Sequence, residues 1–333
     1  MDFSSTLPPQ VTLVVPVYNE EPSNLRLLLE RVALVLEPAL IFYEVLFVDD
    51  GSKAKTHDAL KELADEFDYV RVIVLSRNFG EIPAICAGLA HSRGEAVINM
   101  DSDLQDPPEL IPTMLQYWRE GYDVVFTRQA SRKESVPRQF LAFAFYRLLG
   151  AFSSVKIPVD AGEFRLLSRR AVNAVCATPE KAKFLRGLIP WIGFKNTIIP
   201  FDRDERKFGD SSYTTSKLLQ LAVDGLVAFN MQPLYFIPVL GCVILAGGCL
   251  GLIFSAFSPQ IILGMQLSLV SLLLAVAGAQ VACTGVLAVY LAEVLKETRA
   301  RPTYIVAEEF GKNVVKADHS LNSDGAINSE LSR

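Results

Sequence analysis

The stretch Val11-Thr12-Leu13-Val14-Val15-Pro16-Val17 decides the fold of this chain. It is an uninterrupted, mostly β-branched run, which is typical of a strand buried on both faces. The segment that follows, residues 23–36, has its leucines and valines at helical spacing, with Ser23 in the expected N-cap position. A buried strand followed by an amphipathic helix is the unit from which parallel sheets covered by helices are built.

The same unit recurs along the next hundred residues. Strands that are nearly continuous in apolar residues alternate with amphipathic stretches, which predicts an α/β domain with a mostly parallel, Rossmann-like sheet over residues 1–212. After the first strand and helix, the predicted elements lie at residues 43–48 (strand), 57–67 (helix), 70–75 (strand), 82–90 (helix) and 96–100 (strand).

Each of the first four predicted strands ends in a polar cluster. In parallel sheets, ligands collect beyond the carboxyl ends of the strands. Taken singly, each cluster is an ordinary turn, but together they predict one binding site, because binding residues concentrate on loops held by a rigid scaffold. These strand-end clusters are Pro16-Val17-Tyr18-Asn19-Glu20, Asp49-Asp50-Gly51-Ser52, Ser76-Arg77-Asn78-Phe79-Gly80 and Asp101-Ser102-Asp103.

Two of these residues, Asp101 and Asp103, are carboxylates one residue apart at the end of a buried strand. A charge in such a place loses hydration and needs a cation or strong hydrogen bonds. Carboxylate oxygens suit Mg²⁺ or Mn²⁺, which share a few protein ligands with waters and substrate phosphates. A bare Asp-X-Asp is more often a polar turn. The three neighbouring clusters favour a metal site.

Length and composition exclude some functions. The chain has 333 residues and a net charge of −5, without a basic stripe, which argues against nucleic-acid binding. Its five cysteines are odd in number and lack metal-ligand spacing, which favours a reducing compartment. Residues 1–10 hold no apolar core, so we predict no signal peptide and a cytoplasmic sheet domain.

The second half of the chain predicts a membrane anchor. Between Lys217 and Glu293 the one acidic or basic residue is Asp224. Residues 236–257 and 262–291 are uncharged runs, and about 20 apolar residues cross the ~30 Å hydrocarbon core. We therefore predict two transmembrane helices within residues 234–295; a pair of buried core helices is the alternative.

The flanking segments give the expected topology. Basic residues lie on both sides of the helix pair and none lies in the short turn, so the positive-inside rule predicts a multi-pass protein of the cytoplasmic (inner) membrane with both termini cytoplasmic. Residues 213–233 are amphipathic and predict an interface helix, with an ordinary surface helix as the alternative. We expect residues 296–333 to form a partly disordered cytoplasmic segment. Glycines in the helix pair favour a homo-oligomer.

The strand-end clusters, with the continuation Leu104-Gln105-Asp106-Pro107-Pro108-Glu109, resemble in order and spacing the inverting family 2 glycosyltransferases. Within that family the chain resembles the polyisoprenyl-phosphate glycosyltransferases, such as dolichyl-phosphate mannose synthases and bactoprenol glucosyltransferases. The resemblance covers roughly residues 10–310. It implies a GT-A fold, a nucleotide-sugar donor, a polyisoprenyl-phosphate acceptor and a divalent metal.

The resemblance also implies residue roles. Asp101, Asp103 and Gln105 would hold the metal, with Asp103 central to catalysis. Arg128 and Arg138, after the strand predicted at 123–127, align with phosphate-binding positions, and guanidinium groups suit phosphates. The donor would be held by Pro16, Tyr18, Glu20, Val48, Asp50 and Ser102.

Three further residues are expected near the lipid acceptor. Asp160 matches an acidic position, as an orienting group or as a base; a structural turn carboxylate is the alternative. Arg206 and Ser212 lie in a segment that resembles the family's Arg-X-X-Gly-X-Ser-Lys-Tyr motif. The usual lysine of that motif is Ser212 in this chain, and Lys207 or Lys217 could supply the missing charge.

These features predict an enzyme that transfers one hexose, most simply glucose from UDP-glucose, to undecaprenyl phosphate with inversion. The same reaction with GDP-mannose, UDP-N-acetylglucosamine or a UDP-amino-arabinose derivative is a second hypothesis. A non-catalytic membrane protein that binds nucleotide sugars is a third, and the intact acids Asp50, Asp101 and Asp103 argue against it. A transporter is disfavoured because two helices without buried charge cannot easily enclose a path.

Overall fold

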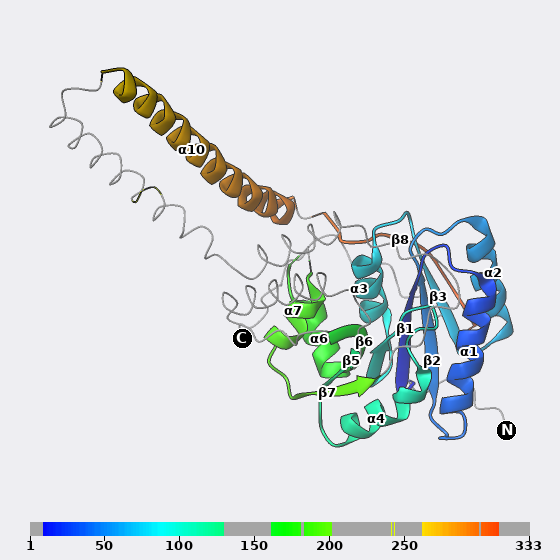
Figure 1. Cartoon of the computed structure of the whole chain (residues 1–333). Coiled ribbons are helices and arrows are strands. Elements are labelled where there is room, and N and C mark those ends of the chain that lie inside the picture. The colour runs from blue at the N-terminus through cyan, green and yellow to red at the C-terminus, as the bar shows by residue number, and fades with distance from the viewer. Residues whose placement is uncertain are drawn as a thin grey trace, which may run out of the picture.

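A computed structural model of the chain describes residues 9–129, 161–180, 183–201, 241, 243, 262–299 and 301–312 (Figure 1). The described strands form one eight-stranded sheet in the order β7-β5-β6-β4-β1-β2-β3-β8. Their bounds are β1 (Val11–Val17), β2 (Tyr43–Asp49), β3 (Val70–Leu75), β4 (Ala96–Asn99), β5 (Val124–Gln129), β6 (Ala161–Ser168), β7 (Asn196–Phe201) and β8 (Val306–Phe310).

The sheet is mostly parallel, as predicted. β4, β1, β2 and β3 run parallel to one another, and β5 is parallel to β7. β6 is antiparallel to β4 and β5, and β8 is antiparallel to β3. Because Val14 stands beside Asn99, and Val17 beside Asp49, the carboxyl ends of the central strands meet at one edge.

Helices cover both faces of the sheet (Figure 1). One apolar core lies between the sheet and α1, α2 and α4, and a second lies between the sheet and α3, α6 and α7. The described helices are α1 (Pro22–Leu36), α2 (Ala54–Glu66), α3 (Glu81–His91), the short 3₁₀ turn η1 (Pro108–Leu110), α4 (Ile111–Arg119), α6 (Arg169–Ala177), α7 (Leu185–Trp191) and α10 (Ile262–Thr298).

The predicted helix at 23–36 is confirmed, but the N-cap prediction is wrong. Leu25, Leu28, Leu29 and Val32 are buried at helical spacing. The helix begins at Pro22, so Glu21 rather than Ser23 is the N-cap residue, and its side chain makes no capping bond. Proline suits the first helical position because its fixed φ fits the helix and its missing N–H would have no partner there.

The C-terminal segment contains a strand that the sequence did not predict. β8 pairs with β3 at the edge of the sheet, with Val72 beside Phe310 and Ile73 beside Glu309. The chain therefore leaves the sheet after β7 and returns to it at β8, on the opposite edge.

The long helix α10 extends away from the sheet (Figure 1) and covers the second predicted membrane segment, 262–291. Within the described residues, no helix is both long and apolar enough to cross a membrane. The first predicted membrane segment, 236–257, lies outside the described residues except for Gly241 and Val243, and so does the predicted interface helix. Both membrane helices and self-association stay predictions.

Candidate functional site

Hydrogen bonds join the strand-end clusters of β1 and β2. The Asn19 backbone N–H donates to Ser52 Oγ at 2.9 Å, and Asn19 Oδ1 accepts from the Lys53 N–H at 2.9 Å. Asn19 has a φ of 54°, a left-handed conformation that asparagine tolerates better than most residues. The two clusters therefore form one continuous surface at the sheet edge.

The clusters of β2 and β3 are joined through Asp50. Its buried carboxylate accepts from the backbone N–H groups of Phe79, at 2.7 Å, and Gly80, at 2.8 Å. Burial raises the pKa of Asp50, and the two hydrogen bonds oppose that rise. Gly51, with a φ of 72°, packs so closely that a Cβ there would lie 2.7 Å from the backbone of Arg77. Asp50 thus orders the loop of residues 76–80.

Glu20 connects the clusters of β1 and β4. Its Oε1 accepts from Asn24 Nδ2 at 2.7 Å, and its Oε2 accepts from Ser102 Oγ at 3.5 Å. All four predicted clusters therefore lie together, because each is hydrogen-bonded to a neighbour.

The turn after β4 holds the predicted metal ligands. Asp103 Oδ1 accepts from the Gln105 N–H at 3.1 Å, and Leu104 between them has a φ of 63°. The buried carboxylate of Asp106 accepts from the Asp101 N–H at 3.1 Å. Asp106, which was not predicted as a site residue, is a structural residue of this turn.

The remaining donor-site predictions differ in exposure. Tyr18 is 54% exposed, and Pro16 is half-buried at the end of β1. The Val48 side chain is fully buried in the core beneath α3. Val48 can therefore reach a ligand only through its backbone.

Arg128 lies near the end of β5, with an exposed side chain, opposite Ala161 of β6 and Pro200 of β7. The other predicted acceptor-side residues, Arg138, Asp160, Arg206 and Ser212, lie outside the described residues, as do Lys207 and Lys217.

A buried charge cluster on β6 and α7 was missed by sequence reasoning. Glu163 on β6 pairs with the fully buried Arg165 and, at 2.7 Å, with Arg186 of α7. Burial alone would raise the pKa of Glu163, but the two guanidinium groups lower it overall. Arg165 Nη1 and, on β4, Asn99 Oδ1 are buried without a hydrogen-bond partner among the described residues. The signal was present: charges two residues apart in a strand share one face.

Glu81, at the start of α3, faces the same charges. Its pKa is raised to about 7, first by desolvation and then by the carboxylates of Asp101 and Glu163. The Glu81 side chain reaches the surface, but the surrounding protein removes enough of its hydration to make the charged form unfavourable.

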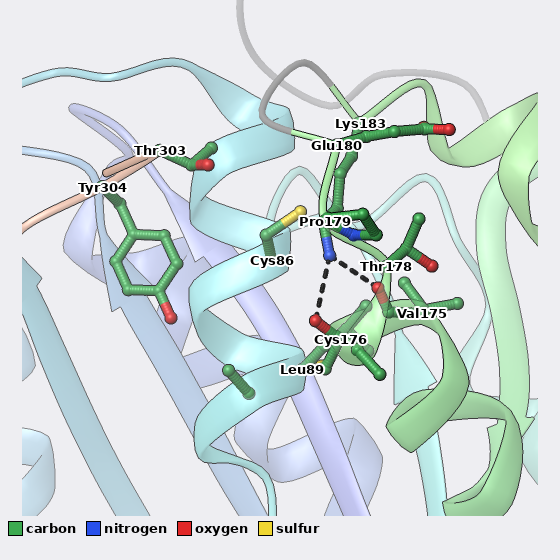
Figure 2. A pocket seen from close by; sticks show the side chains of 12 residues that line it. Cys86, Leu89, Val175, Cys176, Thr178, Pro179, Glu180, Lys183, Thr303 and Tyr304 are labelled. Carbon is green, nitrogen blue, oxygen red and sulfur yellow. Dashed lines mark hydrogen bonds between the residues drawn. The ribbon is translucent and has the colours of Figure 1, made fainter. Parts of the chain in front are cut away.

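A separate cavity of about 320 Å³ lies between α3, the end of α6, and Thr303 and Tyr304 (Figure 2). Cys86, Val175 and Tyr304 are among its lining residues, and Lys183 Nζ donates to the carbonyls of Val175 and Cys176 at 2.6 and 3.3 Å. None of the lining residues belongs to the strand-end clusters. Burial raises the pKa of the Cys86 thiol to about 11, so it is not a nucleophile at neutral pH.

Comparison with known proteins now gives the family. Residues 12–176 match the model of glycosyl transferase family 2. The chain is 40% identical over 312 residues to an uncharacterized glycosyltransferase of Synechocystis, which covers 91% of this chain and 96% of that protein. The chain belongs to glycosyl transferase family 2.

Other relatives of this family 2 glycosyltransferase carry more specific names. The prophage bactoprenol glucosyl transferase homolog of Escherichia coli K12 is 34% identical over 304 residues, which is 89% of this chain and 98% of that protein. Among solved structures, a mannosyltransferase of Pyrobaculum calidifontis in complex with GDP-Man and Mn²⁺ is 18% identical, covers 88% of each chain and has a TM-score of 0.48.

The donor atoms after β4 of this family 2 enzyme fit a divalent cation. Asp101, Asp103 and Gln105 offer carboxylate and amide oxygens on half-buried side chains. Among the described residues, no three His, Cys, Asp or Glu side chains would hold a metal ion by themselves. Mg²⁺ and Mn²⁺ do not require such a cage, because they complete their coordination with waters and substrate phosphates.

Proposed function

We propose that this glycosyltransferase transfers a single hexose, glucose from UDP-glucose, to a polyisoprenyl phosphate such as undecaprenyl phosphate, with inversion at the anomeric carbon. The observation that carries the proposal is the hydrogen-bonded edge formed by Asn19, Glu20, Asp50 and Ser102, with the acidic turn of β4 beside it.

This edge suits a nucleoside diphosphate. Exposed Tyr18 offers an aromatic face for a base, and carboxylate and backbone groups of the strand-end clusters offer acceptors for base and ribose. Asp101, Asp103 and Gln105 would hold a divalent metal, Mg²⁺ or Mn²⁺. When bound, such an ion neutralises the charge that develops on a leaving diphosphate.

A lipid phosphate is a suitable acceptor for this site. One of its oxygens attacks the anomeric carbon from the face opposite the diphosphate, forming a carbon–oxygen bond while the bond to the diphosphate breaks. UDP leaves with the bonding electron pair, and a doubly ionised phosphate has no proton to lose. Exposed Arg128 offers a guanidinium group to offset repulsion between the two phosphates. The name of the Escherichia coli relative supports a bactoprenol acceptor.

We further propose that the acceptor is reached at the cytoplasmic face of the inner membrane. β7 and β8 belong to the same sheet, although residues 202–305 separate them. A chain that leaves a domain and returns to it crosses a membrane an even number of times. The predicted helix pair satisfies this condition, and its basic flanks support cytoplasmic ends.

One assay tests the proposal. The purified full-length protein is incubated with undecaprenyl phosphate, Mg²⁺ or Mn²⁺, and a panel of labelled UDP- and GDP-sugars. We expect a glucosylated lipid from UDP-glucose, lost on chelation of the metal. Product from another donor alone would overturn the choice of sugar, and no glycolipid from any donor would overturn the lipid acceptor.

A further inference from the structure

The segment of residues 301–312, which follows α10, is built into the sheet domain. Thr303 and Tyr304 form one wall of the cavity in Figure 2. The Tyr304 ring lies 6.5 Å from the ring of His91, at the end of α3. β8 then runs beside β3 as the edge strand. The segment begins three residues after the end of α10 and is anchored in the sheet domain by these contacts.

The same segment contacts the loop of residues 76–80. The Ser76 backbone N–H donates to the Ile305 carbonyl at 2.9 Å. At the other end of the loop, the N–H groups of Phe79 and Gly80 donate to Asp50. The loop is thus held at its start by the C-terminal segment and at its end by the donor-site carboxylate.

Ion pairs, one of them centred on a buried arginine, hold residues 301–312 in this register. Arg71 of β3, which is 2% exposed, donates to Glu309 at 2.7 Å and to Glu44 at 2.8 Å. Burial works to lower the pKa of Arg71, but the two carboxylates raise it overall. Lys312 pairs with Asp68 at 2.8 Å. Glu309 therefore ties β8 to a buried charge of β3, and Val306 and Phe310 of β8 pack against the apolar cores.

We propose that residues 301–312 are a positioning element of the donor site, which holds the loop of residues 76–80 in the conformation that binds the nucleotide. The proposal rests on the proposed function, since the nucleotide is its ligand. A loop that is already ordered loses less conformational entropy on binding.

Charge reversal on β8 tests the proposal, with a matched control. Glu309→Lys places a cation against Arg71, whereas Glu308→Lys makes the same change at the neighbouring exposed position. In the full-length detergent-solubilised protein, hydrogen exchange of the residue 76–80 amides should accelerate in Glu309→Lys and stay at the wild-type rate in Glu308→Lys. UDP binding should weaken roughly tenfold in Glu309→Lys alone. Glu309→Gln, which keeps an acceptor oxygen, should restore most of the affinity.

Loop exchange and UDP affinity together distinguish a positioning role of β8 from a role in stability alone. Lower thermal stability of Glu309→Lys with unchanged loop exchange and unchanged UDP affinity would overturn the positioning role. Failure of the wild-type protein to bind UDP would count against the proposed donor, while the exchange measurement would still decide whether β8 orders the loop.

If Glu309→Lys does not fold, Glu309→Ala in the full-length protein replaces it, because it removes a partner of Arg71 without adding a cation. Exchange of the residue 76–80 amides should accelerate and UDP affinity should fall in Glu309→Ala, but not in Glu308→Ala. Unchanged exchange and unchanged affinity in Glu309→Ala would overturn the proposal.

Discussion

Asp50, at the end of β2, accepts a hydrogen bond from the backbone N–H of Gly80 at 2.8 Å. The same carboxylate also accepts from Phe79, so a single buried side chain sets the path of the loop between β3 and α3. From its place at a strand end, Asp50 was expected to contact the nucleoside. The structure shows that both of its oxygens already order the loop, and any contact with a nucleoside would use the remaining lone pairs.

Replacing Asp50 should therefore affect binding through the loop. Asp50→Asn leaves one acceptor oxygen and turns an amide N–H₂ group toward a backbone donor. Charge-assisted hydrogen bonds contribute about 1.5–3 kcal/mol, so UDP affinity measured by calorimetry should fall roughly ten- to hundredfold. Asp58→Asn, at an exposed position of α2, is the control. Equal affinities in the two variants would contradict a role for Asp50.

Loss of Asp103 should abolish transfer without unfolding the protein. Asp103→Ala removes a predicted metal ligand on a half-buried turn, so sugar transfer and metal-dependent donor binding should both disappear. Circular dichroism and the thermal midpoint should stay near those of wild type. Asp65→Ala, on the exposed face of α2, controls for loss of an acid. Full activity of Asp103→Ala would remove this residue from the metal site.

Arg128→Ala should raise the KM for the donor or for the lipid phosphate roughly tenfold, with a smaller change in kcat. The reason is that the guanidinium group would bind a phosphate that is present in the ground state as well as in the transition state. Steady-state kinetics with each substrate varied in turn measure this change. Arg119→Ala, at an exposed position of α4, removes a comparable charge outside the strand-end clusters. Unchanged kinetics for both substrates would exclude Arg128 from the site.

Glu81 should make stability depend on pH in a defined direction. Its pKa is about 7 in the folded protein against an ordinary 4.5. A raised carboxyl pKa means that the folded state binds the proton more tightly, so the contribution of Glu81 is fully present below about pH 4.5 and is lost as pH rises through 7. Glu81→Gln should therefore raise the thermal midpoint at pH 8 and change it little at pH 5.

The matched control for this pH effect is Glu62→Gln, an exposed glutamate of α2. Its midpoint should follow that of the wild type across the range. A Glu81→Gln midpoint that tracks the wild type from pH 5 to 8 would show that Glu81 titrates normally.

Alanine substitutions at Gly51 and Gly121 should distinguish the cost of backbone strain from the cost of steric crowding. Both have positive φ, 72° and 86°, but a Cβ at Gly51 meets the backbone of Arg77 and Asn78, whereas one at Gly121 meets nothing within 4 Å. Gly121→Ala should cost about 1 kcal/mol, and Gly51→Ala about 2–4 kcal/mol because the loop must move as well. Chemical denaturation measures both. Equal losses of unfolding free energy in the two variants would mean that the loop of residues 76–80 moves away from residue 51 at no measurable cost.

Much of the sheet could be predicted from local pattern. The apolar runs at residues 11–17, 43–48 and 70–75 correspond to β1, β2 and β3 within a residue, because a strand buried on both faces needs continuous apolar side chains. The helix start at Pro22 was missed by one residue, since capping preference at Ser23 competes with the stronger preference of proline for the first helical position.

The charge cluster around Glu163 could be predicted only in part. Its alternation with Arg165 in β6 indicates a shared face, but nothing local indicates that Arg186, 23 residues further along, completes the cluster. Likewise β8 has two acids among five residues and resembles a solvated segment until Arg71 supplies a buried partner.

The sequence by itself determined the alternation of strands and helices and the meeting of four polar clusters at one sheet edge. Side-chain periodicity reports burial, and parallel strands bring their carboxyl ends together whatever the loops contain. Only the tertiary structure decided that Asp50 orders the loop of residues 76–80, and that Glu309 joins Arg71 across 238 residues of chain. Pairings of this kind depend on how distant segments pack, and local spacing carries no record of that packing.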